Sequence, residues 1–187
     1  APIGRQILIP RLSEFHARYP DVELHIGMGD RSVDLVREAV DCVIRVGELQ
    51  DSTLVARRIG MLKMITCATP EYLDRYGIPL GIDDLSQHLA VHYFSSRTGR
   101  NFDWDFIVDG QTKQVAMRGS VSVNDSEAYV TCGLQSFGLI QPARFTVLPH
   151  LESGALVEVL HQVSPTPIPM WVAYMQNRHL SVKVRPF

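Results

Sequence analysis

The sequence has no long hydrophobic run and no excess of charge of one sign. No stretch approaches the roughly 18 uncharged apolar residues that a membrane-spanning helix needs, so we expect no membrane partner. Eighteen Lys and Arg residues stand against 20 Asp and Glu residues, which gives a formal net charge of −2. This balance argues against the sequence-independent phosphate binding that a basic surface provides, whereas it leaves a polar small ligand open.

Cysteine is scarce, and the three cysteines, Cys42, Cys67 and Cys132, lie far apart in the sequence. An odd count without close spacing does not form a disulfide framework and is typical of a protein from a reducing cytosol. The chain opens with Ala1-Pro2 rather than with a methionine, a charged leader or an apolar signal segment. We therefore expect a cytoplasmic protein, of which this sequence is a piece cut at its ends.

The motifs of common catalytic and cofactor sites are absent as well. The sequence has no Gly-x-Ser-x-Gly elbow, no Gly-x-x-x-x-Gly-Lys-Ser/Thr phosphate loop and no His-Glu-x-x-His zinc helix. His88 and His92 have the i, i+4 spacing of a pair of metal ligands, but they fall where a helix end passes into a strand. We predict no catalytic residues, no cofactor and no metal.

What the sequence does have is an alternation of helical and strand-like segments over 187 residues, enough chain to bury roughly 70% of its unfolded surface. Apolar residues at helical spacing predict a helix over 5–19, and apolar residues at alternate positions predict a strand over 22–28. Capping residues from Asp30 predict a second helix, and the apolar run over 41–47 is typical of a buried strand. Such an order implies right-handed crossovers and a parallel sheet.

The later part of the chain continues the alternation with one local change of character. Asp109-Gly110 stands between two alternating runs, over 104–108 and 115–117, and predicts a β-hairpin. The run 165–169, with proline at every second position, predicts a stiff extended connector. Further strands are predicted over 62–68, 90–94, 121–123, 138–141, 156–160 and 170–175, and further helices over 69–77, from 83, from 124, over 142–151 and over 180–184.

Six stretches together carry a family resemblance. They are FHARYPDV (15–22), DCVIRVGEL (41–49), DSTLVARRIG (51–60), ATPEYL (68–73), GLQSFGLI (133–140) and RHLS (178–181). Each piece alone is unspecific, but in this order they cover almost the whole chain. Taken together, the chain resembles the effector-binding domain of LysR-type transcriptional regulators.

The resemblance implies an α/β fold with two Rossmann-like lobes joined by two crossing strands, like the type 2 periplasmic binding proteins. Residues 1–69 and 171–187 would form regulatory subdomain I, and residues 70–170 would form regulatory subdomain II. A winged helix-turn-helix would precede Ala1 and is absent from this chain, so DNA would be a partner only through that missing domain. The resemblance also implies self-association into a homodimer or homotetramer.

Three turns fit a ligand site, because ligands of open α/β sheets bind at the carboxyl ends of strands, where helix N-termini present unpaired N–H groups. The turns are Pro2-Ile3-Gly4, Met28-Gly29-Asp30 and Asn124-Asp125-Ser126. From the residues alone, we favour an ordinary cap or turn for each of the three. The resemblance favours the first and third turns as ligand sites, whereas we interpret Asp30 as a cap.

Several other residues have two interpretations. Arg45 interrupts an apolar strand and needs a partner, either a ligand carboxylate or an acidic neighbour such as Asp30 or Glu48. Thr66 and Cys67 either face the cleft beside the first crossing strand or belong to the core, and two phenylalanines could wall a pocket for an aromatic or short-chain acid. The predicted ligand-binding set is Pro2, Ile3, Gly4, Arg45, Thr66, Cys67, Phe94, Asn124, Asp125, Phe137 and Gly138, with a small polar or anionic effector as the ligand.

The resulting prediction is a domain for small-molecule binding and dimerisation in a LysR-type transcription regulator. A solute-binding receptor of a transporter would share the fold but would need export. An enzyme of periplasmic-binding-protein shape is a third hypothesis, for which no cofactor cysteine pattern is present. The sequence upstream of Ala1 would distinguish these hypotheses, since it would hold a helix-turn-helix, a signal peptide or neither.

Overall fold

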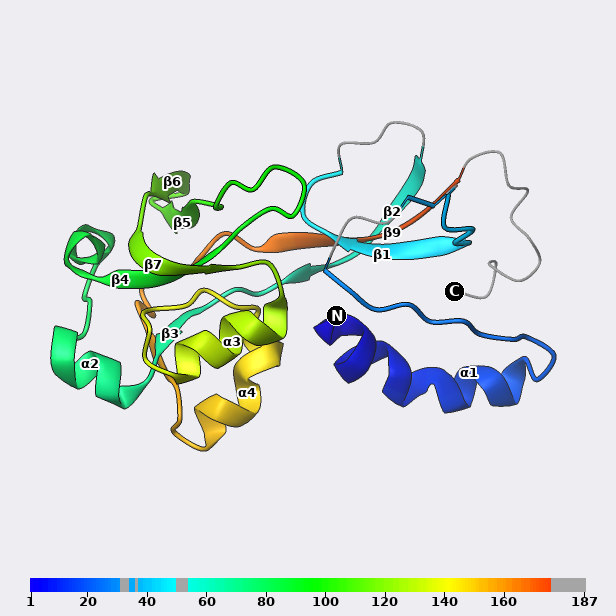
Figure 1. Cartoon of the computed structure of the whole chain (residues 1–187), viewed down its shortest axis with the longest axis horizontal. Helices are drawn as coiled ribbons and strands as arrows, with labels where there is room; N and C mark the ends of the chain where they lie inside the picture. The colour runs from blue at the N-terminus through cyan, green and yellow to red at the C-terminus, as the bar shows by residue number, and fades with distance from the viewer. Residues whose placement is uncertain (31–33, 36, 50–53, 176–187) are drawn as a thin grey trace.

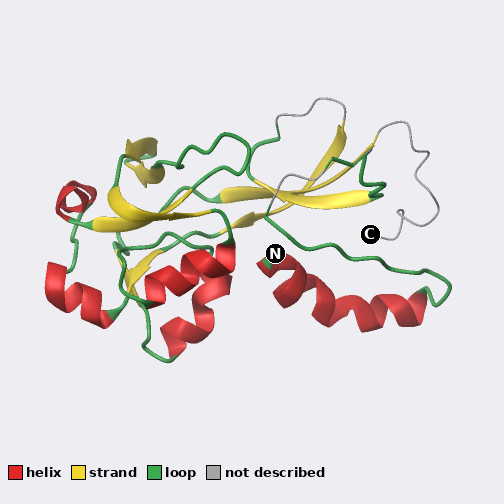
Figure 2. Ribbon diagram, viewed as in Figure 1, coloured by secondary structure: helices red, strands yellow, loops and turns green. Residues whose placement is uncertain are grey.

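The computed structural model describes residues 1–30, 34, 35, 37–49 and 54–175. Two groups of elements lie side by side, and the chain passes between them twice, after β2 and after β8 (Figure 1). We call the group with α1, β1, β2 and β9 the first lobe and the group with β3 to β8 and α2 to α4 the second lobe. In the ribbon view, α3 and α4 lie together against the second lobe's strands, and the N-terminus lies beside them (Figure 2).

The first helical segment contains three kinds of turn. A π-helical turn, η1 (Gly4–Leu8), leads into a 3-10 turn, η2 (Ile9–Arg11), and then into α1 (Leu12–Arg18). Pro10 lies in the middle turn, where its missing N–H prevents regular α-helical bonding. The helix predicted over 5–19, with its irregularity at Pro10, is confirmed. None of its side chains is buried.

The segment predicted as a strand over 22–28 has irregular backbone and pairs with none of the strands that the structure describes. A strand must satisfy its N–H and C=O groups on a neighbour, and alternation of apolar residues does not supply one. Ile26 and Met28 are 38% and 44% exposed. The helix predicted from Asp30 lies partly outside the described residues, and residues 34, 35 and 37–40 form turns or irregular backbone.

The sheet of the first lobe corrects the prediction of a parallel arrangement. Its strands are β1 (Cys42–Val46), β9 (Ile168–Met175) and β2 (Leu54–Leu62), in the order β1-β9-β2, and both neighbours pair antiparallel with β9. Chain order did not reveal this, because the central strand comes from the far end of the chain. The strands predicted over 41–47 and 170–175 are confirmed, β2 was not predicted, and the helix predicted over 180–184 lies outside the described residues.

The second lobe contains the parallel arrangement. In it, β3 (Thr66–Ala68) pairs antiparallel with β8 (Val157–Val159), and β4 (Leu89–Tyr93) pairs parallel with β7 (Arg118–Val123). The short segment Leu139–Ile140 joins the two pairs, through an antiparallel bridge to Cys67 and a parallel bridge to Ala90. The strand order is therefore β8-β3-(139–140)-β4-β7, with β3 alone reversed. Because these three segments are parallel, the carboxyl ends of β4, of β7 and of the 139–140 segment lie at the same edge of the sheet.

Local signals in the second lobe produced the predicted elements. Thr69 accepts a hydrogen bond from the Tyr72 backbone nitrogen (3.2 Å) and caps α2, which ends at Gly77. Asp109 and Gly110 both have positive φ, as the tight hairpin turn requires. The remaining elements are α2 (Pro70–Tyr76), η3 (Ile82–Gln87), β5 (Trp104–Val108), β6 (Gln111–Val115), α3 (Ser126–Leu134) and α4 (Arg144–Glu152).

The hydrophobic core lies in the second lobe, on both faces of its sheet. One cluster holds Tyr72, Trp104, Phe106 and Leu139, and the other holds Cys67, Val91, Tyr129, Ile140 and Val147. Both clusters are assembled from second-lobe elements. Within the described first lobe, by contrast, α1 buries no side chain and the strands bury Leu62 and Ala173. Most of the buried side chains that the structure describes therefore belong to the second lobe.

Candidate functional site

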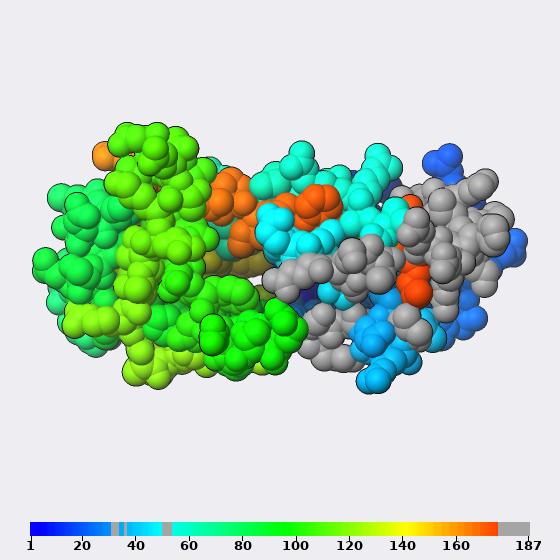
Figure 3. Space-filling view, turned by 90° about the horizontal axis from the view of Figure 1, so that it is seen from above, coloured from blue at the N-terminus to red at the C-terminus, as the bar shows by residue number. Residues whose placement is uncertain are grey.

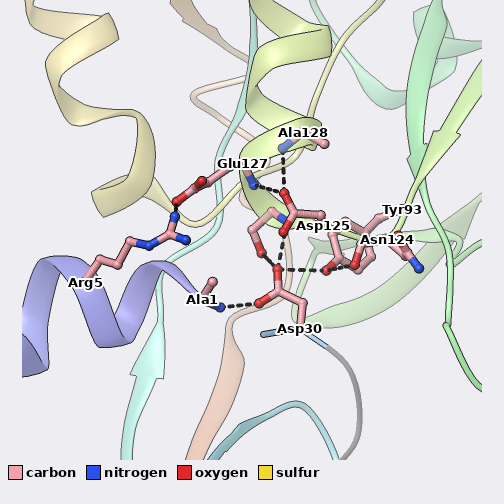
Figure 4. Close-up of polar contacts among 9 residues, drawn as sticks. Ala1, Arg5, Asp30, Tyr93, Asn124, Asp125, Glu127 and Ala128 are labelled. Atoms are coloured by element: carbon pink, nitrogen blue, oxygen red, sulfur yellow. Dashed lines mark hydrogen bonds and ion pairs between the residues drawn. The ribbon is translucent and has the colours of Figure 1, made fainter. Parts of the chain in front are cut away.

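The Asp30 carboxylate lies at a contact between the two lobes. Its Oδ2 accepts hydrogen bonds from the Ser126 backbone N–H (2.7 Å) and from the Ser126 hydroxyl, and it lies 3.3 Å from the Tyr93 hydroxyl (Figure 4). Its Oδ1 accepts a hydrogen bond from the backbone nitrogen of Ala1. The Asp30 side chain is only 12% exposed. A single carboxylate thus binds donors from both lobes.

The topology explains why these donors lie together. Tyr93 is the last residue of β4, and Ser126 is the first residue of α3, which follows β7. Because β4 and β7 are parallel and adjacent, both residues lie at the carboxyl edge of the second-lobe sheet. Asp30 reaches this edge from the first lobe, at the end of the unpaired segment 22–29.

The charges in this cluster follow from its hydrogen bonds. Burial of the Asp30 carboxyl acts to raise its pKa, whereas hydrogen bonds from the Ser126 hydroxyl and backbone N–H act to lower it. Burial, and then the nearby Asp30 charge, raise the pKa of the Tyr93 hydroxyl to about 12. At neutral pH the cluster therefore contains a charged carboxylate and a protonated phenol, whose hydroxyl donates to the Asn124 carbonyl oxygen at 3.0 Å.

The N-terminal end of α3 is already occupied by the chain's own carboxylates. Asp125 Oδ1 accepts hydrogen bonds from the backbone nitrogens of Glu127 (3.0 Å) and Ala128 (2.8 Å), while Asp30 takes that of Ser126. Asn124 donates from its side chain to the Ser96 hydroxyl at 3.2 Å. The turn predicted as a ligand site therefore works as a helix cap, with one of its two carboxylates supplied by the other lobe.

The other predicted turn, Pro2-Ile3-Gly4, lies at the same place. The first hydrogen bond of its helix runs from the Arg5 nitrogen to the Ala1 carbonyl (3.3 Å), so the N–H groups of Ile3 and Gly4 precede the helical ladder. Arg5 also forms an ion pair with Glu127 of α3. A Cβ at Gly4 would lie 2.9 Å from the Met28 sulfur, so the glycine allows the close approach of segment 22–29.

Phe137 and Gly138 lie elsewhere. A Cβ at Gly138 would lie 2.6 Å from the carbonyl oxygen of Leu89, the first residue of β4, whereas Asn124 lies at the last residue of β4. At a rise of about 3.3 Å per residue, these two ends are roughly 13 Å apart. Gly138 serves close backbone packing, and Phe137 is 50% exposed. The structure does not bring this pair to the Asp30 cluster, so we leave both out of the candidate site.

Thr66 and Cys67 are both buried, on opposite faces of the sheet. Burial and the nearby Glu158 carboxylate raise the pKa of the Cys67 thiol to about 12, and Cys67 packs in the core between the sheet and α3. Thr66 is 1% exposed, yet its hydroxyl has no hydrogen-bond partner. The side-chain nitrogen of Gln141 is likewise buried without a partner. Sequence analysis did not single out Gln141.

The backbone register makes Thr66 and Gln141 direct neighbours. Cys67 and Ile140 exchange both backbone hydrogen bonds (3.0 and 2.9 Å), and the Ile65 nitrogen bonds the Pro142 carbonyl (3.1 Å). The pair between them, Thr66 and Gln141, is therefore a non-hydrogen-bonded antiparallel pair, with Cα atoms about 4.5 Å apart and side chains close. Two unsatisfied polar groups consequently lie beside each other at the carboxyl edge.

Two further predicted residues are placed as follows. Phe94 follows β4, half-buried, and donates its backbone N–H to the Val123 carbonyl (2.8 Å), so it lies beside Tyr93 and Asn124. Arg45 is half-buried in β1 opposite Trp171 of β9. The sequence suggested Asp30 as a possible ion-pair partner of Arg45. The described partners of Asp30 are instead Ala1, Tyr93 and Ser126. Asp30 was predicted to cap the helix that follows it, which lies partly outside the described residues; its described hydrogen bonds to a helix come from Ser126 of α3 in the other lobe.

The residues missed by sequence analysis are Tyr93 and Gln141. Tyr93 gave a usable signal, because it is a polar aromatic at the end of a buried strand, where ligand-facing residues of α/β sheets lie. Seen from above, the surface is hollowed between the green atoms of the second lobe and the cyan atoms of the first (Figure 3). A separate open pocket of about 480 Å³ between η3 and β6, lined by Ile82, Asp83, Ser86 and 113–116, contains none of the predicted residues.

The described residues contain no group of three or more His, Cys, Asp or Glu side chains that could hold a metal ion. Within the same part of the chain, no helix has the length and hydropathy needed to cross a membrane.

Comparison with known proteins places this geometry in a family. The profile of the LysR substrate binding domain matches residues 1–187. The chain is 37% identical over 185 residues to YhjC, an uncharacterised HTH-type transcriptional regulator of Escherichia coli K12, covering 99% of this chain and 62% of that protein. It is 34% identical over 186 residues to an HTH-type transcriptional repressor of Pseudomonas aeruginosa, covering 99% and 58%.

Solved structures agree with the fold. The full-length structure of AphB, a Vibrio cholerae virulence activator of the LysR type, superposes with a TM-score of 0.78 at 26% identity, over 98% of this chain and 62% of that chain. The regulatory domain of CrgA from Neisseria meningitidis superposes with a TM-score of 0.78 at 24% identity, over 100% and 90%, which supports the fold alone. The predicted two-lobed fold, like that of periplasmic binding proteins, is confirmed.

These relatives decide between the hypotheses drawn from the sequence. They are transcriptional regulators and not receptors of transporters. The chain spans 62% and 58% of the lengths of the two curated relatives described above. This chain belongs to the LysR substrate-binding domain family, the effector-binding domains of LysR-type transcription regulators.

Proposed function

We propose that this domain binds a small polar or anionic effector between its lobes, where the helix start at Pro2–Gly4 meets the N-terminal end of α3. The observation that supports this site is the Asp30 carboxylate, which takes hydrogen bonds from Ala1 on one side and from Ser126 on the other. Donors that converge on one carboxylate are suited to an oxygen-bearing ligand. Phe94, beside Tyr93, would supply an apolar wall.

The wider role of the protein is also a proposal. Because the relatives are HTH-type regulators and are longer than this chain, we propose that a DNA-binding domain elsewhere in the protein reads effector occupancy. The domain itself has a net charge of −2 and would bind no operator alone. We propose residues 1–69 with 171–187, and residues 70–170, as the two subdomains, and a cytoplasmic regulator without catalytic activity.

Gly4→Leu is expected to weaken effector binding at least tenfold while the domain stays folded. The larger side chain would fill the space beside the first helix start, and the atom it meets, the sulfur of the half-exposed Met28, belongs to a flexible side chain that can move. The effector would be found by a thermal-shift screen against metabolites, and the affinities would be measured by calorimetry.

Gly27→Leu is the matched control, since nothing lies within 4 Å of a Cβ at Gly27. It should bind the effector as the wild type does. If an effector found in the screen binds Gly4→Leu and Asn124→Ala with unchanged affinity, the proposed site is wrong.

Self-association is expected through the first lobe, as a homodimer or homotetramer. Large apolar side chains are exposed there on a lobe that buries few of its own, and exposed apolar surface of this kind is typical of an interface. These side chains are Ile7, Ile9, Ile26, Met28, Val46, Ile59 and Met61.

Sedimentation equilibrium should show a dimer or larger for the wild type and at least about tenfold weaker association for Ile9→Glu. Leu80→Glu is the control, because Leu80 is 81% exposed on the second lobe, outside the proposed interface. A wild type that stays monomeric at tens of micromolar, or equal weakening by both substitutions, would contradict the proposal.

A further inference from the structure

Two buried polar side chains at the carboxyl edge of the second-lobe sheet have no hydrogen-bond partner in the part of the chain that the structure describes. Thr66 is 1% exposed, and its hydroxyl bonds to no other group. The side-chain nitrogen of Gln141, the neighbour of Thr66 across the strands, is buried without a partner as well. Native proteins retain few such atoms, and each needs a physical reason.

This pair lies where the chain crosses from the first lobe into the second. Thr66 begins β3, four residues after β2 ends at Leu62. Gln141 directly follows the 139–140 segment, whose carboxyl end lies at the same edge of the sheet as the ends of β4 and β7. Ligands of open α/β sheets bind at this edge. The pair is therefore at the edge on which the proposed effector site lies.

The neighbouring strand places the pair on the same face as the proposed apolar wall. Leu139 bridges Ala90 of β4 in parallel register, so Gln141, two residues later, falls opposite His92, which is 8% exposed. Phe94 comes two residues after His92 and shares its face, because side chains of an extended chain alternate between faces. An effector that contacts Phe94 would therefore have the pair within reach on the next strands.

The chemistry of the pair decides which group it can bind. The amide nitrogen of Gln141 is only a donor, whereas the hydroxyl of Thr66 can donate or accept. Together they offer two donors to one oxygen atom. Both side chains are neutral, and burial of an unpaired charge costs much more than burial of a neutral polar atom. The pair is therefore suited to a neutral oxygen, a hydroxyl or a carbonyl, and not to a carboxylate.

We propose that Thr66 and Gln141 bind a neutral hydroxyl or carbonyl oxygen of the effector, so that the effector is a hydroxy acid or an oxo acid. This inference rests on the proposed function, in which the helix starts bind the anionic end, and it adds the second functional group. A site built to hydrogen-bond a ligand oxygen rejects the analogue that lacks it, because its buried polar groups are then left unpaired. The two side chains consequently determine specificity.

Acids that differ by one oxygen are the probes. They are propionate with lactate and pyruvate, succinate with malate, and benzoate with the hydroxybenzoates. In the wild type, at least one hydroxy or oxo acid should bind at least about tenfold more tightly than its parent acid, measured by calorimetry at one pH and one ionic strength. In Thr66→Val combined with Gln141→Leu this preference should disappear, while the affinity for the parent acid stays unchanged. Thr66→Val alone should already weaken the preference, which covers a double variant that fails to fold.

Thr66→Ser and Thr146→Val are the matched controls. Thr66→Ser keeps a hydroxyl at the same position, and Thr146→Val removes a hydroxyl that already donates to the Ala143 carbonyl (2.7 Å). Both variants should keep the preference of the wild type. If the wild type binds no hydroxy or oxo acid of the panel more tightly than its parent acid, or if the preference survives in the double variant, the proposal is overturned.

Gly4→Leu separates this inference from the proposed function. If Gly4→Leu abolishes binding of the parent acids and the wild type shows no preference, the site at the helix starts is supported and the role of Thr66 and Gln141 is refuted. If Gly4→Leu binds the acids as the wild type does and the double variant loses the preference, the oxygen-binding pair is supported and the site at the helix starts is wrong.

Discussion

Phe106→Ala is expected to lower the free energy of unfolding by about 3–5 kcal/mol, the range for removing a fully buried phenylalanine. Phe106 is 0% exposed in β5, and its ring meets that of Trp104 edge-on at 6.3 Å. Domains are typically stable by only about 5–15 kcal/mol, so this one substitution removes a large share of the total. The melting temperature should fall by roughly 6–20 °C.

Phe15→Ala in the first lobe is the control for Phe106→Ala, because the buried side chains lie mainly in the second lobe. Phe15 contacts Tyr19 at 5.0 Å between ring centroids but belongs to α1, which buries no side chain. Its loss should cost about 1 kcal/mol or less. Denaturant titration, at a protein concentration where the domain is monomeric, measures the free energy of unfolding of both variants. Equal losses in the two variants would contradict the conclusion that the second lobe carries the stability.

Thr66→Val combined with Gln141→Leu is expected to have the opposite sign and to stabilise the domain by about 2–4 kcal/mol. Each side chain has a buried polar atom without a partner, and such an atom costs roughly 1–3 kcal/mol in desolvation. The replacements keep similar shapes and remove those atoms. Because the residues are neighbours, the two single variants must also be measured to find their coupling.

Thr146→Val is the matched control for this gain. The Thr146 hydroxyl donates to the Ala143 carbonyl at 2.7 Å, so its removal should cost about 1 kcal/mol. Thermal unfolding of the four variants gives the comparison. If Thr66→Val and Gln141→Leu destabilise as Thr146→Val does, the two polar groups are satisfied in the folded protein, for example by a buried water.

The candidate site was only partly accessible from the sequence. Pro2–Gly4 and Asn124–Asp125 were predicted as sites and lie next to residues that bond the same carboxylate, since Asp30 contacts both Ala1 and Ser126. Phe137 and Gly138 were grouped with them, although the structure places these residues at the other end of β4. A linear pattern shows that a turn precedes a strand, but not which edge of the sheet that turn lies on.

The hydrogen-bond partners of Asp30 could likewise not be predicted from the sequence around it. Its side-chain type and position predict a cap for the helix that directly follows it, because local hydrogen-bonding chemistry decides such a cap. The helix that it caps begins 96 residues later. Nothing in the local sequence specifies that distant partner, since only the packing of one lobe against the other brings α3 within reach.

The sequence by itself determined the elements whose causes are local. Thr69-Pro70 began a helix, Asp109-Gly110 turned a hairpin, and Asp125 capped α3, each through a side chain or backbone property of the residue itself. Tertiary structure decided strand pairing. The apolar alternation over 22–28 has no strand partner among the described residues, and β9 lies between β1 and β2 and pairs antiparallel with both, against the predicted parallel order. The physical reason is that the hydrogen bonds of a strand are made to another segment, so its identity and direction depend on where the rest of the chain lies.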